Sequence, residues 1–488
     1  MEIEMGNNTS QRNTDLFYYL LSKSSAKKTI EKQPRNEGGN LFPLSFSQEE
    51  FYFLYQLQPD DLALNVSFAY QLSGQLNISA LEKTFSEVIK RHEIMRTVFI
   101  NQGAFQSILP FTHFHLPMID IEAENVENPV AYAQEILSDI SRKPYDLAQG
   151  PLFRVQLIKL AEENYILWWG MHHIICDAWG QMTLMKEIKA LYAWYAFDKK
   201  HELPELFLQM ADFAVWQRKN YETGGLKEKT LTWVTKLSGY EKNVTLPIDF
   251  ERPAKQTYHG MSENIHIGEE IRRKLKELSV LNNTTLFTII LSALKMLIYK
   301  FTNQVDIVIG SPFSIRNFDF LENLICDLSN MLLYRTVFDE NDSIDSAIGK
   351  VKEATLETIK YNDVPSQHIY YSLNHKHDPA YSPLFQVMLV FHQIFTRDND
   401  QFIEGMTSKY VHIANKSSQF DLSLFLFDDD EIGLYGKFDY NTALYTRETI
   451  CEFIKCFTII LKIIAEKPEL KIVDLSKTIE RERIYMYA

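Results

Sequence analysis

Two adjacent histidines, His172 and His173, are followed by an aspartate, Asp177, four residues after the second. The apolar run 165–169 before them has the length and residue types of a buried β-strand. Beyond them, apolar residues recur at helical spacing over 181–196. The histidines are therefore predicted to lie on a strand-to-helix loop, where a rigid scaffold often holds catalytic side chains. A neutral imidazole there can accept a proton or hold a nucleophile by a hydrogen bond.

Spacing alone leaves other interpretations of this pair open. A histidine pair beside a strand is more often structural than catalytic. A metal site is a weaker interpretation, because adjacent histidines rarely point the same way and no Cys or carboxylate set here has zinc spacing. We therefore expect no metal ion at this loop.

The composition favours a globular protein that does not bind nucleic acid. The 488 residues are 45% hydrophobic and 13% aromatic, enough for large cores in two or three domains. The net charge of −14 argues against nucleic acid and anionic membranes as partners. The longest apolar runs, 286–294 and 456–465, are too short to span a bilayer, and the acidic N-terminus is no signal peptide. The four cysteines show no CxxC or metal spacing, which favours a reduced, cytoplasmic protein.

The stretch 171–180 resembles the HHxxxDG core motif of the condensation domains of nonribosomal peptide synthetases. Residues 91–99 match the family's RHExLRTxF motif almost letter for letter, and 212–218 match its ADFAVWQR motif. The resemblance covers about residues 43–475. The remaining core motifs follow in the family's order at 44–50 (with Glu50 where Arg is usual), 309–317, 328–332, 361–365 and 378–384.

The resemblance implies an α/β (α+β) fold of two chloramphenicol-acetyltransferase-like lobes, in a V-shaped pseudo-dimer with an active-site tunnel between them. Residues 41–222 would form the N-terminal lobe and 223–475 the C-terminal lobe. Residues 1–40 would be an N-terminal tail, either disordered or a docking segment for another subunit. Residues 476–488 would be a C-terminal linker.

Two further strands are predicted at 420–424 and 436–441, and the resemblance implies that this hairpin region crosses from one lobe to the other. The turn between them carries a run of acidic residues, 428–431. Such a run is as a rule a solvated hairpin tip, so we expect no metal there.

The resemblance also implies roles for individual residues. His173, the motif's second histidine, would orient the amine or accept its proton, and His172 would shape the loop. Asp177 would form a largely buried ion pair with Arg316 and hold elements of the two lobes in register. Removing one partner of such a pair often costs about 3–5 kcal/mol. Further structural support of the site is expected from Ala178, Trp179 and Asn330.

Two positions depart from the family's motif. Ala178 stands where the family has glycine, so a positive φ there would be strained. Gly180 replaces the usual serine, and the sequence assigns it no role. The DxxxxD motif of heterocyclisation domains is absent, which sets that related family aside.

The activity implied by the resemblance is amide-bond formation between an acyl or peptidyl thioester and an amine. One carrier protein would bring the donor on its phosphopantetheine arm, and the acceptor would be a second carrier's aminoacyl group or a free amine. The chain itself is expected to bind no cofactor and to work as a monomer with other synthetase subunits. Ester formation, acylation of free amines by a stand-alone enzyme, and a catalytically silent recruiting domain are the alternatives. The second histidine favours catalysis, because recruiting relatives typically lose it.

Overall fold

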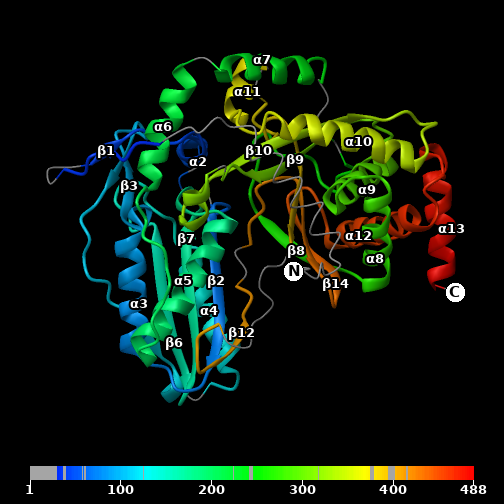
Figure 1. Cartoon of the computed structure of the whole chain (residues 1–488). Helices are drawn as coiled ribbons and strands as arrows, with labels where there is room; N and C mark the ends of the chain where they lie inside the picture. The colour runs from blue at the N-terminus through cyan, green and yellow to red at the C-terminus, as the bar shows by residue number, and fades with distance from the viewer. Residues whose placement is uncertain are drawn as a thin grey trace, which may run out of the picture.

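The computed structural model shows two α/β halves, each built around its own β-sheet and lying side by side (Figure 1). It describes residues 30–487, except 37–39, 58, 60–61, 125, 224, 241–243, 245, 317, 374–377, 394–401 and 414–415. Most of the predicted N-terminal tail, residues 1–29, lies outside the described residues, so a docking role for it stays a prediction.

The first half contains a five-stranded sheet in the order β12-β2-β7-β6-β5, in which β5 alone pairs in parallel. Helices α3 and α5 cover one face and α4 covers the other. A small sheet, β1-β4-β3, and helices α2 and α6 complete this half. The bounds are β1 (Leu41–Phe42), α2 (Phe46–Leu57), β2 (Asn65–Ser73), α3 (Ile78–Arg91), β3 (Thr97–Ile100), β4 (Phe105–Ile108), β5 (Met118–Asp120), α4 (Pro129–Ser141), β6 (Phe153–Ala161), β7 (Asn164–His172), α5 (Ala178–Phe197) and α6 (Met210–Glu222).

Strand β7 is buried on both faces, and its side chains alternate between two cores. Leu167, Trp169 and Met171 pack under α3 and α5, while Ile166 and Trp168 pack under α4. Burial of both faces accounts for the uninterrupted apolar run of this strand. The predicted strand before the histidine pair is therefore confirmed, as is the helix after it.

The second half contains a six-stranded sheet in the order β10-β9-β11-β13-β14-β8. Helix α9 is buried over most of its length, to Tyr299, between this sheet and helices α8, α10 and α12. Helices α7 and α11 pack on the opposite face. The bounds are α7 (Gly225–Leu237), β8 (Gly260–Ile267), α8 (Glu269–Leu281), α9 (Leu286–Thr302), β9 (Asp306–Ser314), β10 (Ser329–Val337), α10 (Ile344–Ile359), α11 (Ser366–Leu373), β11 (Val387–Gln393), β12 (Thr407–Tyr410), β13 (Leu422–Asp429), β14 (Gly433–Asn441), α12 (Arg447–Glu466) and α13 (Leu475–Tyr487).

The chain of the second half enters the first half at two places. Strand β12 pairs antiparallel with β2, with Thr407 opposite Ser73 and Tyr410 opposite Tyr70. The segment 315–328, between β9 and β10, packs its apolar side chains into the core of the first half. The prediction that the 420–441 hairpin crosses between the lobes is wrong, because β13 and β14 both belong to the six-stranded sheet.

The acidic turn at 428–431 is solvated at its tip, as the sequence suggested, but not at its base: Asp430 and Glu431 are exposed, whereas Asp428 and Asp429 are buried. Asp428 is buried and pairs with two cations of helix α8, Arg272 at 2.5 Å and Lys276 at 3.0 Å. Asp430 pairs with the same two side chains. These cations lie four positions apart and therefore share one face of α8. The acidic run therefore binds the hairpin to helix α8 through these ion pairs.

The segments flanking the predicted lobes pack on them. Arg35, from the stretch predicted as tail, pairs with Glu93 at 2.8 Å and with Asp212 at 3.0 Å. At the other end, the stretch predicted as linker forms helix α13, whose Glu482 pairs with Lys462 and Lys467 of the α12 region. The described residues of both stretches therefore pack on the rest of the fold.

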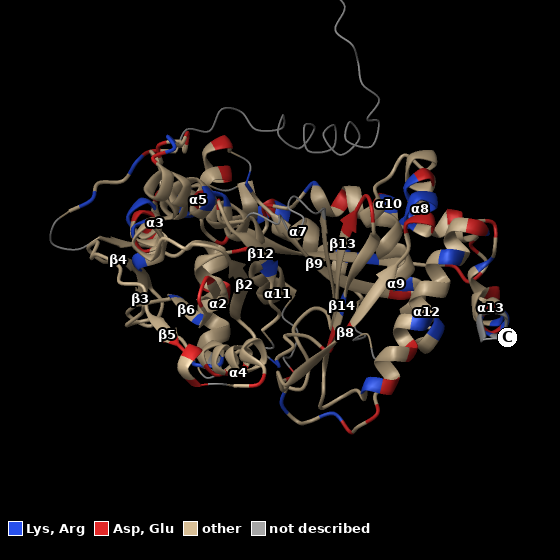
Figure 2. Ribbon diagram, turned by 90° about the horizontal axis from the view of Figure 1, so that it is seen from below, with Lys and Arg blue, Asp and Glu red and all other residues tan. Residues whose placement is uncertain are grey.

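Acidic and basic residues are interspersed along the outer helices α8, α12 and α13 (Figure 2). Among the described residues, no single helix is long and apolar enough to cross a membrane. Helices α8 and α9 meet that requirement only as a pair bent by 107°.

A buried lysine in the middle of α9 gives the second half a pH-dependent stability. The Lys295 ammonium donates to the carbonyls of Ile307 at 2.8 Å and Tyr334 at 2.6 Å, and burial lowers its pKa to about 7. In the unfolded chain this group titrates near 10.4. Between these values the unfolded chain binds more protons, so the contribution of Lys295 to stability rises with pH from about 7 to about 10.

Lys295→Met removes this titrating group while keeping an unbranched, apolar side chain. We expect the melting temperature of the native protein to rise, relative to that of the variant, by a few degrees between pH 7 and pH 9. Circular dichroism melts of both proteins at pH 7, 8 and 9 measure this. If the difference in melting temperature between the two proteins stays constant from pH 7 to pH 9, Lys295 does not titrate in that range.

Candidate active site

The histidine pair lies where strand β7 ends and helix α5 begins. His172 is the last residue of β7, and His173 starts a short 3-10 helix, η3 (His173–Ile175). Asp177 is the N-cap of α5, and its side chain accepts a 2.7 Å hydrogen bond from the backbone N–H of Gly180. An aspartate at this place satisfies one of the free N–H groups of the helix start, which fixes the loop geometry.

His172 is buried and faces the protein interior. Its Nδ1 accepts a hydrogen bond from the backbone N–H of Ile174 at 3.1 Å, and the rings of Tyr55 and Tyr145 pack edge-on against it. Burial, with a smaller contribution from His173, lowers the pKa of His172 to about 3. It is therefore neutral at physiological pH and holds the shape of η3.

His173 faces a carboxylate on one side and is accessible on the other. Its Nδ1 is buried 2.9 Å from Oδ2 of Asp327, while 31% of its side chain remains accessible. The ring of Phe51 on α2 lies 4.8 Å from the imidazole, centre to centre. Burial lowers the pKa of His173, but the hydrogen bond and charge of Asp327 and the charge of Asp177 raise it overall above its ordinary value. In the described part of the chain, no group bonds to its Nε2.

Asp177 and Arg316 form a bidentate ion pair between the two halves, at 2.5 and 2.9 Å. Both side chains are largely buried, with 8% and 4% accessible. The second oxygen of Asp177 also accepts from the backbone N–H of Leu328, and Arg316 donates to the carbonyl of Cys326. The pair therefore fixes the 315–328 segment against the start of α5.

The two departures from the family's motif have structural explanations. Ala178 is the first residue of α5 and has a negative φ, so no strain arises from the missing glycine. At Gly180, a Cβ atom would lie 3.0 Å from Sγ of Cys176 and 3.1 Å from the backbone N and O of Cys326. Glycine thus lets α5 approach the 315–328 segment closely.

Trp179 and Asn330 bind backbone groups on either side of the loop. Trp179 Nε1 donates to the carbonyl of Glu322 at 2.9 Å, from α5 to the inserted segment. Asn330 Nδ2 donates to the carbonyls of Asn362 and Val364, both at 2.7 Å. The site residues named from the sequence therefore lie in one region, and their functional roles stay predictions.

Two acidic residues of this region were not recognised as site residues from the sequence. Asp327 lies directly before the 328–332 motif, and no spacing rule connects it with a histidine so far away in the chain. Glu50, noted only as a departure from the family's arginine, accepts a hydrogen bond from Ser366 Oγ at 3.0 Å. Burial, opposed by this bond and aided by the charge of Asp327, raises the pKa of Glu50 to about 7. The glutamate in place of the family's arginine was therefore the feature of the sequence that could have identified Glu50.

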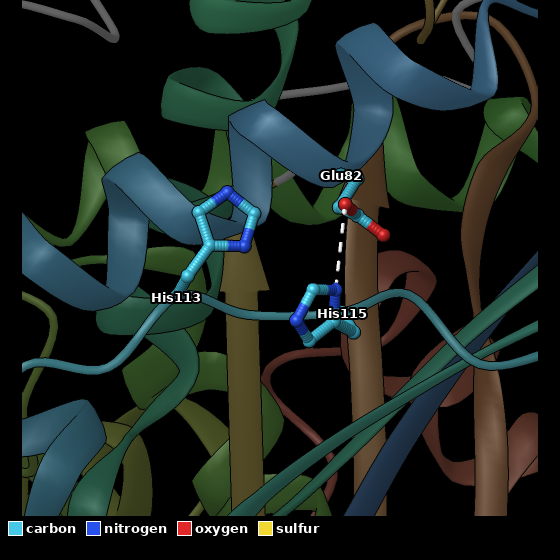
Figure 3. A group of neighbouring side chains, drawn as sticks. All are labelled: Glu82, His113 and His115. Carbon is cyan, nitrogen blue, oxygen red and sulfur yellow. Dashed lines mark ion pairs between the residues drawn. The ribbon is translucent and has the colours of Figure 1, made fainter.

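A separate group of metal-ligating side chains lies at the surface of the first half (Figure 3). Glu82 on α3 faces His113 and His115, with ligand atoms within 4.8 Å of one another. Tetrahedral zinc needs its ligand atoms about 3.3 Å apart. Both histidines are exposed and Glu82 already binds the backbone N–H of Leu116, so the group is not arranged as a metal centre.

The arrangement of two α/β halves with a paired-histidine loop in the first half is a fold that other proteins share. Solved structures share it at low sequence identity. The X-domain from teicoplanin biosynthesis matches with a TM-score of 0.82 and 22% identity, over 92% of this chain and 99% of that one. The first condensation domain of the calcium-dependent antibiotic synthetase, solved with a substrate analogue, matches with a TM-score of 0.72 and 14% identity, over 89% and 99%.

Sequence relatives specify the family. Residues 40–486 match the family model described as Condensation domain. The chain is 35% identical to a linear gramicidin synthase protein of Brevibacillus parabrevis, over 90% of this chain and 9% of that protein. It is 30% identical to a plipastatin synthase protein of Bacillus subtilis (strain 168), over 91% and 17%. The chain therefore belongs to the condensation-domain family of nonribosomal peptide synthetases and spans less than a fifth of these curated relatives.

Proposed function

We propose that the chain catalyses amide-bond formation between a carrier-bound acyl or peptidyl thioester and an amine. One observation carries this proposal: the imidazole of His173 has its buried Nδ1 against a carboxylate and its Nε2 without a partner among the described residues. An imidazole in this arrangement can accept a proton at Nε2 from a nucleophile.

The proposed reaction conserves atoms and charge. The amine nitrogen attacks the thioester carbonyl, and Nε2 of His173 takes up the proton that the nitrogen releases. The C–N bond forms, the C–S bond breaks, and the proton passes to the departing thiolate of the carrier's arm. Help of this type is typically worth about 10²–10⁴ in rate. The ion pair between Asp177 and Arg316 would keep the loop in place during these steps.

The partners belong to the proposal as well. The related proteins are synthetase subunits far longer than this chain, which supports carrier domains of such subunits as donor and acceptor. The phosphopantetheine arm would come from those carriers, with no cofactor bound by the chain itself. We further propose a cytoplasmic, monomeric protein without nucleic-acid or membrane partners.

A second candidate function is recruitment of a partner enzyme without catalysis. The observation that favours it is the likeness to the X-domain from teicoplanin biosynthesis, which was also solved in a complex with OxyB. The intact histidine pair, with His173 accessible, favours catalysis instead. Ester formation with an alcohol acceptor uses the same histidine and is the alternative chemistry.

The test is a reconstituted transfer assay followed by intact-protein mass spectrometry. An acyl-loaded donor carrier is mixed with an acceptor carrier bearing an aminoacyl group. Parallel reactions contain an acceptor carrier bearing a hydroxyacyl group, or a free amine. We expect a mass gain on the aminoacyl carrier. A gain on the hydroxyacyl carrier alone would indicate ester formation, and acylation of free amines alone would indicate a stand-alone enzyme. No transfer to any acceptor would contradict catalysis and favour recruitment.

A further inference from the structure

The carboxylate behind His173 comes from the other half of the molecule. Asp327 lies in the segment that crosses from the second half, whereas His173 lies on the loop of the first half. The Asp327 side chain is inaccessible to solvent, and its Oδ2 lies 2.9 Å from Nδ1 of His173. The contact therefore exists only when the two halves are assembled.

Asp327 is held in place at its side chain and at its backbone. Its Oδ1 accepts hydrogen bonds from the backbone N–H and the hydroxyl of Ser329, at 3.0 and 2.9 Å. Its backbone carbonyl accepts from Ser47 Oγ on α2 at 3.1 Å. These bonds restrain the carboxylate in the orientation that faces the imidazole of His173.

We propose that Asp327 is a positioning residue, which keeps a proton on Nδ1 of His173 and thereby presents Nε2 as the acceptor for the amine's proton. A neutral imidazole carries a single N–H, and the partner of one nitrogen determines which nitrogen bears it. A carboxylate only accepts, so it selects the form with the proton on Nδ1. This inference rests on the proposed function, because it concerns the same histidine.

Three further titratable groups interact with His173 or with Asp327. Asp177 contributes a second negative charge, and His172, which is neutral, lies next to it in the chain. Glu50 on α2 interacts with Asp327 and has a pKa of about 7, so it gains or loses a proton near neutral pH. All three remain in place in a variant altered only at position 327. Asp327→Asn also removes the charge that helps to raise the pKa of Glu50, so the variant reports the loss of Asp327 together with the easier ionisation of Glu50.

The experiment compares the native chain with Asp327→Asn, which keeps the size of the side chain and removes its charge. Nuclear magnetic resonance of histidine-labelled protein follows the titration of His173, with the signal assigned through its loss in His173→Gln. We expect the His173 midpoint to fall by at least about half a pH unit. Turnover is expected to fall by about ten- to a thousand-fold. The acid limb of the pH profile of turnover should move to lower pH in Asp327→Asn, because a His173 imidazole that is a weaker base stays deprotonated to lower pH.

Two further variants keep the test decisive. Asp327→Glu retains the charge, so its His173 midpoint and its turnover should lie between those of Asp327→Asn and those of the native chain. Ser329→Ala removes one of the groups that hold Asp327 and should shift the midpoint in the same direction by a smaller amount, even if Asp327→Asn fails to fold. An unchanged His173 midpoint in the folded variants would overturn the inference, whatever their turnover. If the variants shift the His173 midpoint but the native chain transfers no acyl group, the proposed function is contradicted and the positioning contact between Asp327 and His173 is supported.

Discussion

Replacement of His173 by alanine is expected to lower the turnover of carrier-to-carrier transfer by about 10²–10⁴ while leaving the fold intact. Nε2 of this side chain has no partner among the residues that the structure describes, and 31% of the side chain is accessible. Removing it deletes the proton acceptor without opening a deep cavity. Single-turnover mass spectrometry of the acceptor carrier measures the loss.

A matched control separates this effect from general damage. His113→Ala removes an exposed histidine of the same half that takes no part in the site, and its turnover should equal that of the native protein. Circular dichroism should show the same melting temperature, within a few degrees, for the native protein, His173→Ala and His113→Ala. Near-native turnover in His173→Ala would refute the proton-acceptor role and leave a structural role for the histidine pair.

Asp177→Ala is expected to destabilise the protein by about 3–5 kcal/mol and to lower its solubility. The carboxylate accepts four hydrogen bonds, from both terminal nitrogens of Arg316 and from the backbone N–H groups of Gly180 and Leu328. Its loss deprives the buried Arg316 guanidinium of its ion-pair partner and removes the N-cap of α5. Chemical denaturation, followed by tryptophan fluorescence, measures the change in the free energy of unfolding.

An exposed ion pair serves as the control for this effect. Arg273 and Glu277 lie four positions apart on α8, with 57% and 58% of their side chains accessible. Glu277→Ala should therefore change the free energy of unfolding by about 0.5 kcal/mol or less. An Asp177→Ala variant that is as stable as Glu277→Ala, and merely slow, would contradict the structural account of the Asp177 pair.

The local features of the site could be predicted from the sequence because their signals are local. An apolar run marks β7, helical spacing marks α5, and the histidine pair lies between them. The pairing of Asp177 with Arg316 was expected from the family's motifs alone, since no periodicity links such distant residues.

The features that were missed depend on partners far away in the chain. The burial of Asp428, at the start of the acidic turn, was missed because its partners on α8, Arg272 and Lys276, precede it by more than 150 positions. Strand β12 has a short, polar sequence, and its place at the edge of the first sheet depends on β2. The contact of Asp327 with His173 likewise depends on how the 315–328 segment is placed, which local sequence does not determine.

Strand β12 also bears on how the protein is made. It pairs with β2 across a separation of 334 residues, and the 315–328 segment fills part of the same core. During synthesis, the β2 edge of the first sheet therefore stays unpaired until residue 410 has left the ribosome. The core of the first half likewise stays incomplete until the 315–328 segment has been made. Contacts between such distant positions are slow to form and leave unpaired edges prone to association in the meantime. The two halves are thus expected to mature together as one cooperative unit, and a gene fragment ending before β12 should yield an aggregating product.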